Sequence, residues 1–121
     1  MHLLDTNVIS ELMRPRPLER VLDWAAGLDR CAFSVVTLEE VWFGLALKRS
    51  ARLERWFDNF VRERAEVLPV TLQIARRCAG FRAQFRAGGR TRTQADMLIA
   101  ATANEHDYTL VTRNERDFAG C

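Results

Sequence analysis

The pattern of apolar and polar positions divides the chain into short buried strands and longer amphipathic helices. An apolar strand begins almost at the first residue and ends in the carboxylate of Asp5. Thr6 and Asn7 follow, and because both residue types cap helices, a short helix is expected over residues 8–13. Ligands of open α/β sheets bind outside the carboxyl ends of the strands, so Asp5 is a candidate site residue.

The rest of the chain repeats this alternation of strand and helix. Further strands are expected over residues 31–36, 67–70 and 108–112. Further helices are expected between Pro17 and Gly27 and over residues 37–46, 53–61, 71–87 and 93–103. Pro69 indicates that the strand holding it lies at a sheet edge. The pattern predicts an α/β fold with a parallel sheet covered by helices on both faces.

Length and composition narrow the class of protein. A chain of 121 residues suits a single domain, 1–121, and a hydrophobic content of 48% is enough for a folded core. No apolar run is long enough for a membrane span, and the N-terminus does not resemble a signal peptide. Three cysteines without a CxxC pattern indicate a reducing compartment, so a cytoplasmic location is expected. Two histidines argue against a zinc site.

Arginine is concentrated in one part of the chain. Residues 71–95 contain six arginines and no acidic residue. Arg86, Arg90 and Arg92 lead up to the helix that starts near Asp96, where they can guide a phosphate backbone. An ordinary solvated face explains the same run of charge, and the sequence leaves both interpretations open.

Polar side chains follow two of the predicted strands and begin two of the predicted helices. Asp5 follows the first strand, Asn114 and Asp117 follow the last, and Glu40 and Asp96 lie in first turns of helices. Four acids from distant parts of the sequence are therefore expected to converge in one crevice. Oxygen-only ligands suit Mg²⁺ or Mn²⁺, which activates water and stabilises charge at phosphorus. This chemistry is that of a metal-dependent phosphodiesterase.

The two helix acids also have a structural interpretation. Thr37 with Glu40, and Thr93 with Asp96, each fit the capping box, in which the acid closes the N-terminus of a helix. Taken alone, each pair is explained better by capping than by metal binding. Their combination with a carboxylate at the end of the most buried strand favours metal binding over capping.

Four segments of the chain resemble the motifs of PIN domains. Residues 3–7 resemble the family's opening, residues 34–44 its second motif, residues 96–103 its third and residues 110–118 its fourth. The resemblance covers the whole chain in the right order. It implies a PIN-like three-layer α/β/α sandwich with a central, mainly parallel sheet of four to five strands. Relatives continue past the last motif into a further edge strand, so that edge is expected to be short or missing here.

The size and the Asp-Thr-Asn start are most similar to the VapC-type toxins of bacterial toxin–antitoxin pairs. The resemblance implies an Mg²⁺- or Mn²⁺-dependent endoribonuclease with RNA as its substrate. It also implies a homodimer and a VapB-like antitoxin that blocks the site, with a heterotetramer or larger assembly formed by the two proteins.

The same resemblance assigns roles to single residues. Asp5, Glu40 and Asp96 are expected to hold the metal and carry the reaction, with Asp117 as the fourth acid. Many relatives carry an acid at the position of Asn114, so Asp117 has to supply that carboxylate.

Residues beside these acids are expected to contact the substrate. Thr6, Asn7, Thr112 and Asn114 are expected to position metal-bound waters or the phosphate.

Two other functions are weighed against this one. A phosphatase of the haloacid-dehalogenase type also places an aspartate after its first strand, but it needs a second acid where this chain has Asn7 and a downstream lysine. Lys48 is the only lysine. A PIN fold without turnover that binds RNA or a protein partner is the second alternative, and Asn114 is its best support.

Bulky aromatic residues gather on two consecutive helices. Trp42 and Phe43 are adjacent on one, and adjacent helical residues point about 100° apart, so they cannot share one narrow core stripe. Trp56 belongs to the next helix. We expect part of this helix pair to form a groove for an antitoxin helix; the alternative is that the two helices pack together and bury all the aromatics.

Overall fold

The computed structural model of the protein describes residues 1–113 and 118–121. Its strands are β1 (His2–Leu4), β2 (Cys31–Ser34), β3 (Ala65–Leu68) and β4 (Thr109–Val111). Its helices are α1 (Thr6–Leu12), α2 (Glu19–Ala26), α3 (Val35–Lys48), α4 (Ala51–Arg64), α5 (Leu72–Ala87) and α6 (Gln94–His106). Within the described ranges, every helix is too short or too polar to cross a bilayer.

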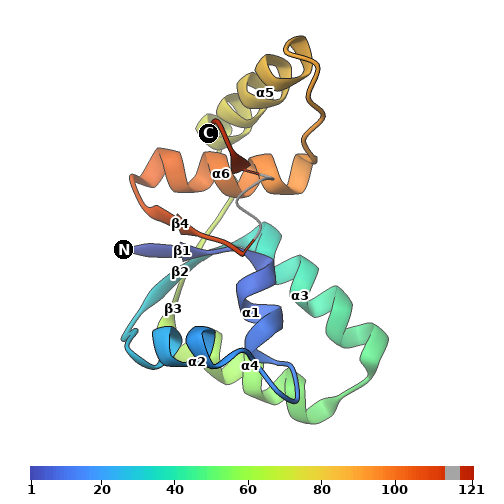
Figure 1. Ribbon diagram of the computed structural model, residues 1–121, viewed down its shortest axis with the longest axis vertical. Helices are drawn as coiled ribbons and strands as arrows, with labels where there is room; N and C mark the ends of the chain where they lie inside the picture. Colours follow the sequence, from blue (N-terminus) through green and yellow to red (C-terminus); the bar gives the residue numbers. More distant parts are fainter. Residues whose placement is uncertain (114–117) are drawn as a thin grey trace.

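The strands form one parallel sheet in the order β3-β2-β1-β4. The first strand of the chain therefore lies inside the sheet, with Leu3 opposite Ala32 on one side and Leu110 on the other (Figure 1). The strand containing Val67 lies at the edge, as Pro69 indicated. The carboxyl end of β1 consequently opens between two neighbouring strands, and Asp5 follows directly after it.

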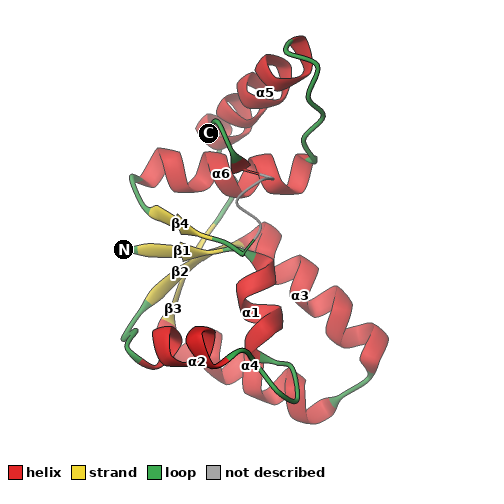
Figure 2. Ribbon diagram, in the orientation of Figure 1, coloured by secondary structure: helices red, strands yellow, loops and turns green. Residues whose placement is uncertain are grey.

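Helices cover both faces of the sheet, and alternate residues of each strand point to opposite layers. Leu3 and Ala32 pack in one core with residues of α5 and α6. Leu4 and Phe33 pack in the other core with residues of α1, α3 and α4. Figure 2 shows α5 and α6 on one side of the sheet and α1 to α4 on the other. The predicted three-layer α/β/α sandwich is confirmed, with four strands among the described residues.

The start of α3 differs from the sequence-based expectation. The strand ends at Ser34, whose hydroxyl accepts a 3.1 Å hydrogen bond from the backbone N–H of Val36 and caps the helix. The predicted cap at Thr37 is wrong, because Ser34 already serves the first free N–H groups. Thr37 lies inside the first turn and is fully buried. Glu40 therefore lies in the second turn, beyond the reach of a capping box.

The start of α2 also differs. The helix begins at Glu19, two residues after Pro17, and Leu18 occupies the cap position without a side-chain bond to the helix. The backbone N–H of Leu18 instead donates a 2.9 Å hydrogen bond to the Glu11 carboxylate, which comes from α1. Glu11, a distant residue, thus replaces the local cap. A local sequence pattern does not reveal this replacement.

Candidate active site

Asp5 forms the centre of the candidate site. Its side chain caps α1, with Oδ1 accepting a 2.7 Å hydrogen bond from the backbone N–H of Thr6. Oδ2 accepts hydrogen bonds from the Thr112 hydroxyl at 2.8 Å and from the Asn7 amide at 3.3 Å. The residue is only 1% exposed, and no cationic side chain in the described ranges forms an ion pair with it. A buried carboxylate surrounded by neutral donors is well placed to bind a cation.

Glu40 is connected to Asp5 through a single residue. The Thr6 hydroxyl donates a 2.7 Å hydrogen bond to Oε1 of Glu40, while the backbone of the same threonine binds Asp5. The structure therefore brings together the carboxylate that follows β1 and the carboxylate on α3. Glu40 is half-buried.

Asp96 lies in the first turn of α6 and is also half-buried. The backbone N–H of Asp96 donates a 3.1 Å hydrogen bond to the hydroxyl of Thr93, which caps the helix as predicted. Val36, in the first turn of α3, packs against the core formed with α6. In Figure 1 the N-terminal end of α6 lies on the same side of the molecule as the carboxyl end of β1. Asp96 thus starts a helix on the opposite face of the sheet from Glu40.

The donor chemistry fits a hard divalent cation. The acids at this edge offer only carboxylate oxygens, with hydroxyl and amide groups beside them. Within residues 1–113 and 118–121, no three acidic, histidine or cysteine side chains form a complete metal cluster. Mg²⁺ commonly binds through one or two carboxylates and completes its shell with water and substrate phosphate, so Asp5 and Glu40 suffice as a starting set. The predicted site residues Asn114 and Asp117 lie outside the described residues.

The residues expected to contact substrate differ in whether they bind the carboxylates or face solvent. Thr6, Asn7 and Thr112 all donate hydrogen bonds to the carboxylates. Arg86 and Arg90 are exposed, at the end of α5 and in the loop that follows.

Arg92 is packed more closely than the other two arginines. Its guanidinium carbon lies 4.9 Å from the ring centroid of Phe85, and the group donates a 3.1 Å hydrogen bond to the carbonyl oxygen of Ala119. Arg92 therefore joins α5 to the C-terminal residues.

Glu11 is a further buried acid, 2% exposed on α1, that the sequence patterns did not single out. Its carboxylate accepts hydrogen bonds from Arg113 at 2.6 Å and from the backbone N–H of Leu18 at 2.9 Å. Arg14 adds a 3.4 Å ion pair from the surface. The available signal was its spacing, because Glu11 lies three residues after Val8 and shares its buried face. An acid on the apolar face of a helix requires partners from elsewhere in the fold.

Comparisons with known proteins show what this chain is similar to. Residues 2–120 match the model of the PIN domain family. The chain is 35% identical over 130 residues to Toxin FitB of Neisseria gonorrhoeae, covering 98% of this chain and 91% of that protein. It is 35% identical over 126 residues to VapC ribonuclease Y4jK of Sinorhizobium fredii, covering 98% and 90%. Among solved structures, a toxin-antitoxin complex from Klebsiella pneumoniae superposes with a TM-score of 0.78 at 26% identity, covering 99% and 92%.

Proposed function

This chain belongs to the PIN-domain family, and from that premise we propose that it is an Mg²⁺- or Mn²⁺-dependent endoribonuclease that acts as the toxin of a toxin–antitoxin pair. The observation that carries the proposal is the Asp5–Thr6–Glu40 arrangement, in which one threonine holds two carboxylates from different elements. Relatives named toxin and VapC ribonuclease, each aligned over 98% of this chain, support the reaction and the role.

The residues of this chain prepare the site before the metal and the substrate arrive. Hydrogen bonds from Thr6, Asn7 and Thr112 hold the Asp5 carboxylate in one orientation. Glu40 is held by Thr6, and Asp96 and Asp117 are proposed to complete the acidic set. When bound there, the divalent ion supplies charge that favours deprotonation of the attacking water and stabilises the leaving oxygen of the phosphodiester.

A cluster of carboxylates repels the phosphate backbone of RNA, so residues outside the acidic set have to attract the substrate. The exposed arginines Arg86 and Arg90 are proposed to attract the RNA at a distance from the acids.

The proposed partner is a VapB-like antitoxin that blocks the site, with the toxin itself forming a homodimer and the two proteins a heterotetramer or larger assembly. The fold similarity to a chain of a toxin-antitoxin complex supports the presence of an antitoxin partner. An exposed aromatic surface on α3 and α4 also supports it, since Phe43 is 61% exposed and Trp42 is 46% exposed.

A PIN fold that binds RNA or protein without cleaving it is a second candidate. It is favoured by the identity of Asn114, which stands where many relatives carry an acid. Under that function the Asp5 network only fixes the start of α1.

Cleavage of total cellular RNA by the purified full chain separates the two candidates. We expect fragments with Mg²⁺ or Mn²⁺, none with a chelator, and none from Asp5→Asn. Sequencing the 5′ ends of the fragments identifies the target. A folded wild-type chain that cleaves no RNA with either metal, over a range of RNA classes, contradicts the nuclease and favours the binding module.

A further inference from the structure

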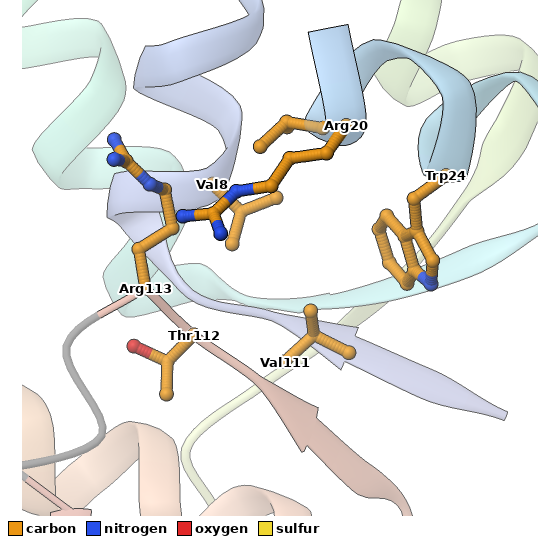
Figure 3. A pocket seen from close by; sticks show the side chains of 7 residues that line it. Val8, Arg20, Trp24, Val111, Thr112 and Arg113 are labelled. Carbon is orange, nitrogen blue, oxygen red and sulfur yellow. The ribbon is translucent and has the colours of Figure 1, made fainter. Parts of the chain in front are cut away.

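A pocket of about 500 Å³ lies beside Asp5, and none of the site residues predicted from sequence except Thr112 borders it. It is lined by Val8, Arg20, Val21, Trp24, Val111, Thr112 and Arg113. Figure 3 shows Arg20 extending from α2 toward the side where Val8 and Arg113 lie, with the indole of Trp24 on the opposite side. The volume is in the range of small-ligand sites.

The pocket is lined by both apolar and cationic groups. Three valine side chains and the Trp24 indole supply the apolar part, and two guanidinium groups supply the positive charge. No acid lies among the described residues that line it. Arg113 is paired with Glu11, which is outside the pocket lining, whereas no carboxylate in the described ranges forms an ion pair with Arg20. A ligand with a flat apolar part and a negative group complements this surface.

Thr112 connects the pocket to the acidic centre. It lines the pocket, and its hydroxyl donates the 2.8 Å hydrogen bond to Oδ2 of Asp5. A polymer whose phosphate lies at Asp5 therefore places an adjoining unit at this pocket. The ligand must therefore be a polymer that carries a negative group and a flat ring in each unit. A nucleic acid strand meets both requirements.

The walls of the pocket are fixed from inside the protein. The buried Glu11 carboxylate binds the backbone N–H of Leu18, at the start of α2, and the guanidinium of Arg113. It therefore joins the wall made by α2 to the wall made by the end of β4. The His2 ring packs at 88° to the Trp24 indole, with centroids 5.7 Å apart, and supports it from β1.

We propose that this pocket binds the nucleotide of single-stranded RNA next to the scissile phosphate, with the base on Trp24 and the backbone phosphate on Arg20 and Arg113. Aromatic side chains stack on unpaired bases, and arginine matches phosphate with two parallel N–H donors. The inference rests on the proposed nuclease function for the position of the phosphate. It adds a binding site on the side of β4 away from α6.

The test measures binding of labelled hexaadenylate to the full chain by anisotropy, in a chelator so that no cleavage occurs. Removing a stacked base contact typically costs about 1–3 kcal/mol, or roughly 5- to 150-fold in affinity. We expect Trp24→Leu and Arg20→Ala each to weaken binding at least about fivefold. Trp24→Phe should stay within about twofold, because phenylalanine also stacks on bases.

Matched controls separate the pocket from general effects of charge and folding. Arg16→Ala removes the same charge from an exposed position that does not line the pocket, and should weaken binding less than Arg20→Ala. Inorganic polyphosphate should compete poorly for the wild-type chain, since it has no base to stack. Equal melting temperatures for Trp24→Leu and Trp24→Phe exclude loss of fold; if Trp24→Leu is less stable, the Arg20→Ala and Arg16→Ala pair decides.

Each outcome is decisive for one of the two proposals. If hexaadenylate binding depends on Trp24 and Arg20 but the chain cleaves no RNA, the nucleotide-binding pocket is retained and the nuclease function is rejected. The nucleotide-binding role of the pocket is overturned if the wild-type chain cleaves RNA while Trp24→Leu and Arg20→Ala bind hexaadenylate normally. Variants that bind hexaadenylate normally but escape inhibition by the proposed antitoxin also overturn it, and assign the pocket to a protein partner.

Discussion

The hydroxyl of Thr6 donates a 2.7 Å hydrogen bond to Oε1 of Glu40, 34 positions further along the chain. The backbone N–H of the same residue binds Oδ1 of Asp5 at 2.7 Å. One side chain and one peptide group thus hold two carboxylates from separate layers of secondary structure. Two like charges close together cost free energy, and hydrogen bonds from a shared donor residue offset part of that cost.

Replacing Thr6 by valine should reduce RNA cleavage, because valine keeps the shape but cannot donate to Glu40. We expect a loss of about 10- to 100-fold in kcat, the range for disturbing residues that orient metal ligands. Thr6→Ser retains the hydroxyl and should retain most of the activity. Steady-state cleavage at several Mg²⁺ concentrations provides the measurement. Equal activity of the valine and serine variants contradicts the orienting role.

Replacing Asp96 by asparagine should abolish cleavage and leave the melting temperature unchanged or higher, because one of several repelling charges is removed. The capping bond at this helix uses the backbone N–H of Asp96 and the hydroxyl of Thr93. Thr93→Ala is therefore the matched control, expected to lose about 0.5–2 kcal/mol of stability while cleavage persists. A less stable Asp96→Asn variant with full activity would return this residue to a purely structural role.

The free energy of unfolding should fall as the pH rises from about 9 to 11. Burial raises the pKa of the Cys31 thiol from 9.0 to about 11, and nearby Arg64 and Arg30 oppose the shift. The unfolded chain therefore releases this proton at lower pH than the folded chain, so stability present below pH 9 is lost through pH 11. A shift of this size corresponds to about 2–3 kcal/mol. Urea unfolding at pH 8.5 and 10.5 should show a smaller pH effect in Cys31→Ala.

Replacing Phe43 by glutamate should prevent inhibition by the antitoxin without preventing cleavage. Phe43 is 61% exposed on α3 and close in sequence to Trp42, which is 46% exposed and donates a 3.2 Å hydrogen bond to Asp58. Burying an unpaired charge at such an interface costs affinity, and we expect a loss of at least about tenfold. Co-purification and growth on co-expression provide the measurements.

Leu72 offers a control for that substitution. It is 76% exposed on α5, in the other helical layer, so Leu72→Glu adds the same charge to a different apolar position. This variant should remain inhibited by the antitoxin. If Phe43→Glu is also fully inhibited, the antitoxin does not bind through this part of α3.

The aromatics of α3 and α4 divide between core and surface. Phe57 is fully buried and meets Phe33 and Trp42 edge-on, whereas Phe43 and Trp56 remain exposed. The interpretation that the helix pair buries all of them is therefore wrong. The periodicity located the helices correctly, but exposure depends on which neighbouring layer covers each face.

The sequence by itself determined the succession of strands and helices along the chain, the three-layer fold and the position of Asp5 at the carboxyl end of the first strand. These follow from local rules, because hydrophobic period sets the element type and a parallel sheet brings its strand ends to one edge. The Thr93 cap of α6 was also predictable, since both of its partners lie within four residues.

Tertiary structure alone decided which polar groups meet. Ser34 displaced Thr37 as the cap of α3, which moved Glu40 into the second turn beside Thr6. Thr112 reaches Asp5 from 107 positions away, and Arg113 reaches Glu11 from 102. A hydrogen bond over such a separation depends on strand order and register, which no local pattern encodes. The partners of the buried Glu11 and the pocket beside Asp5 therefore became visible only when α1, α2 and β4 were brought together.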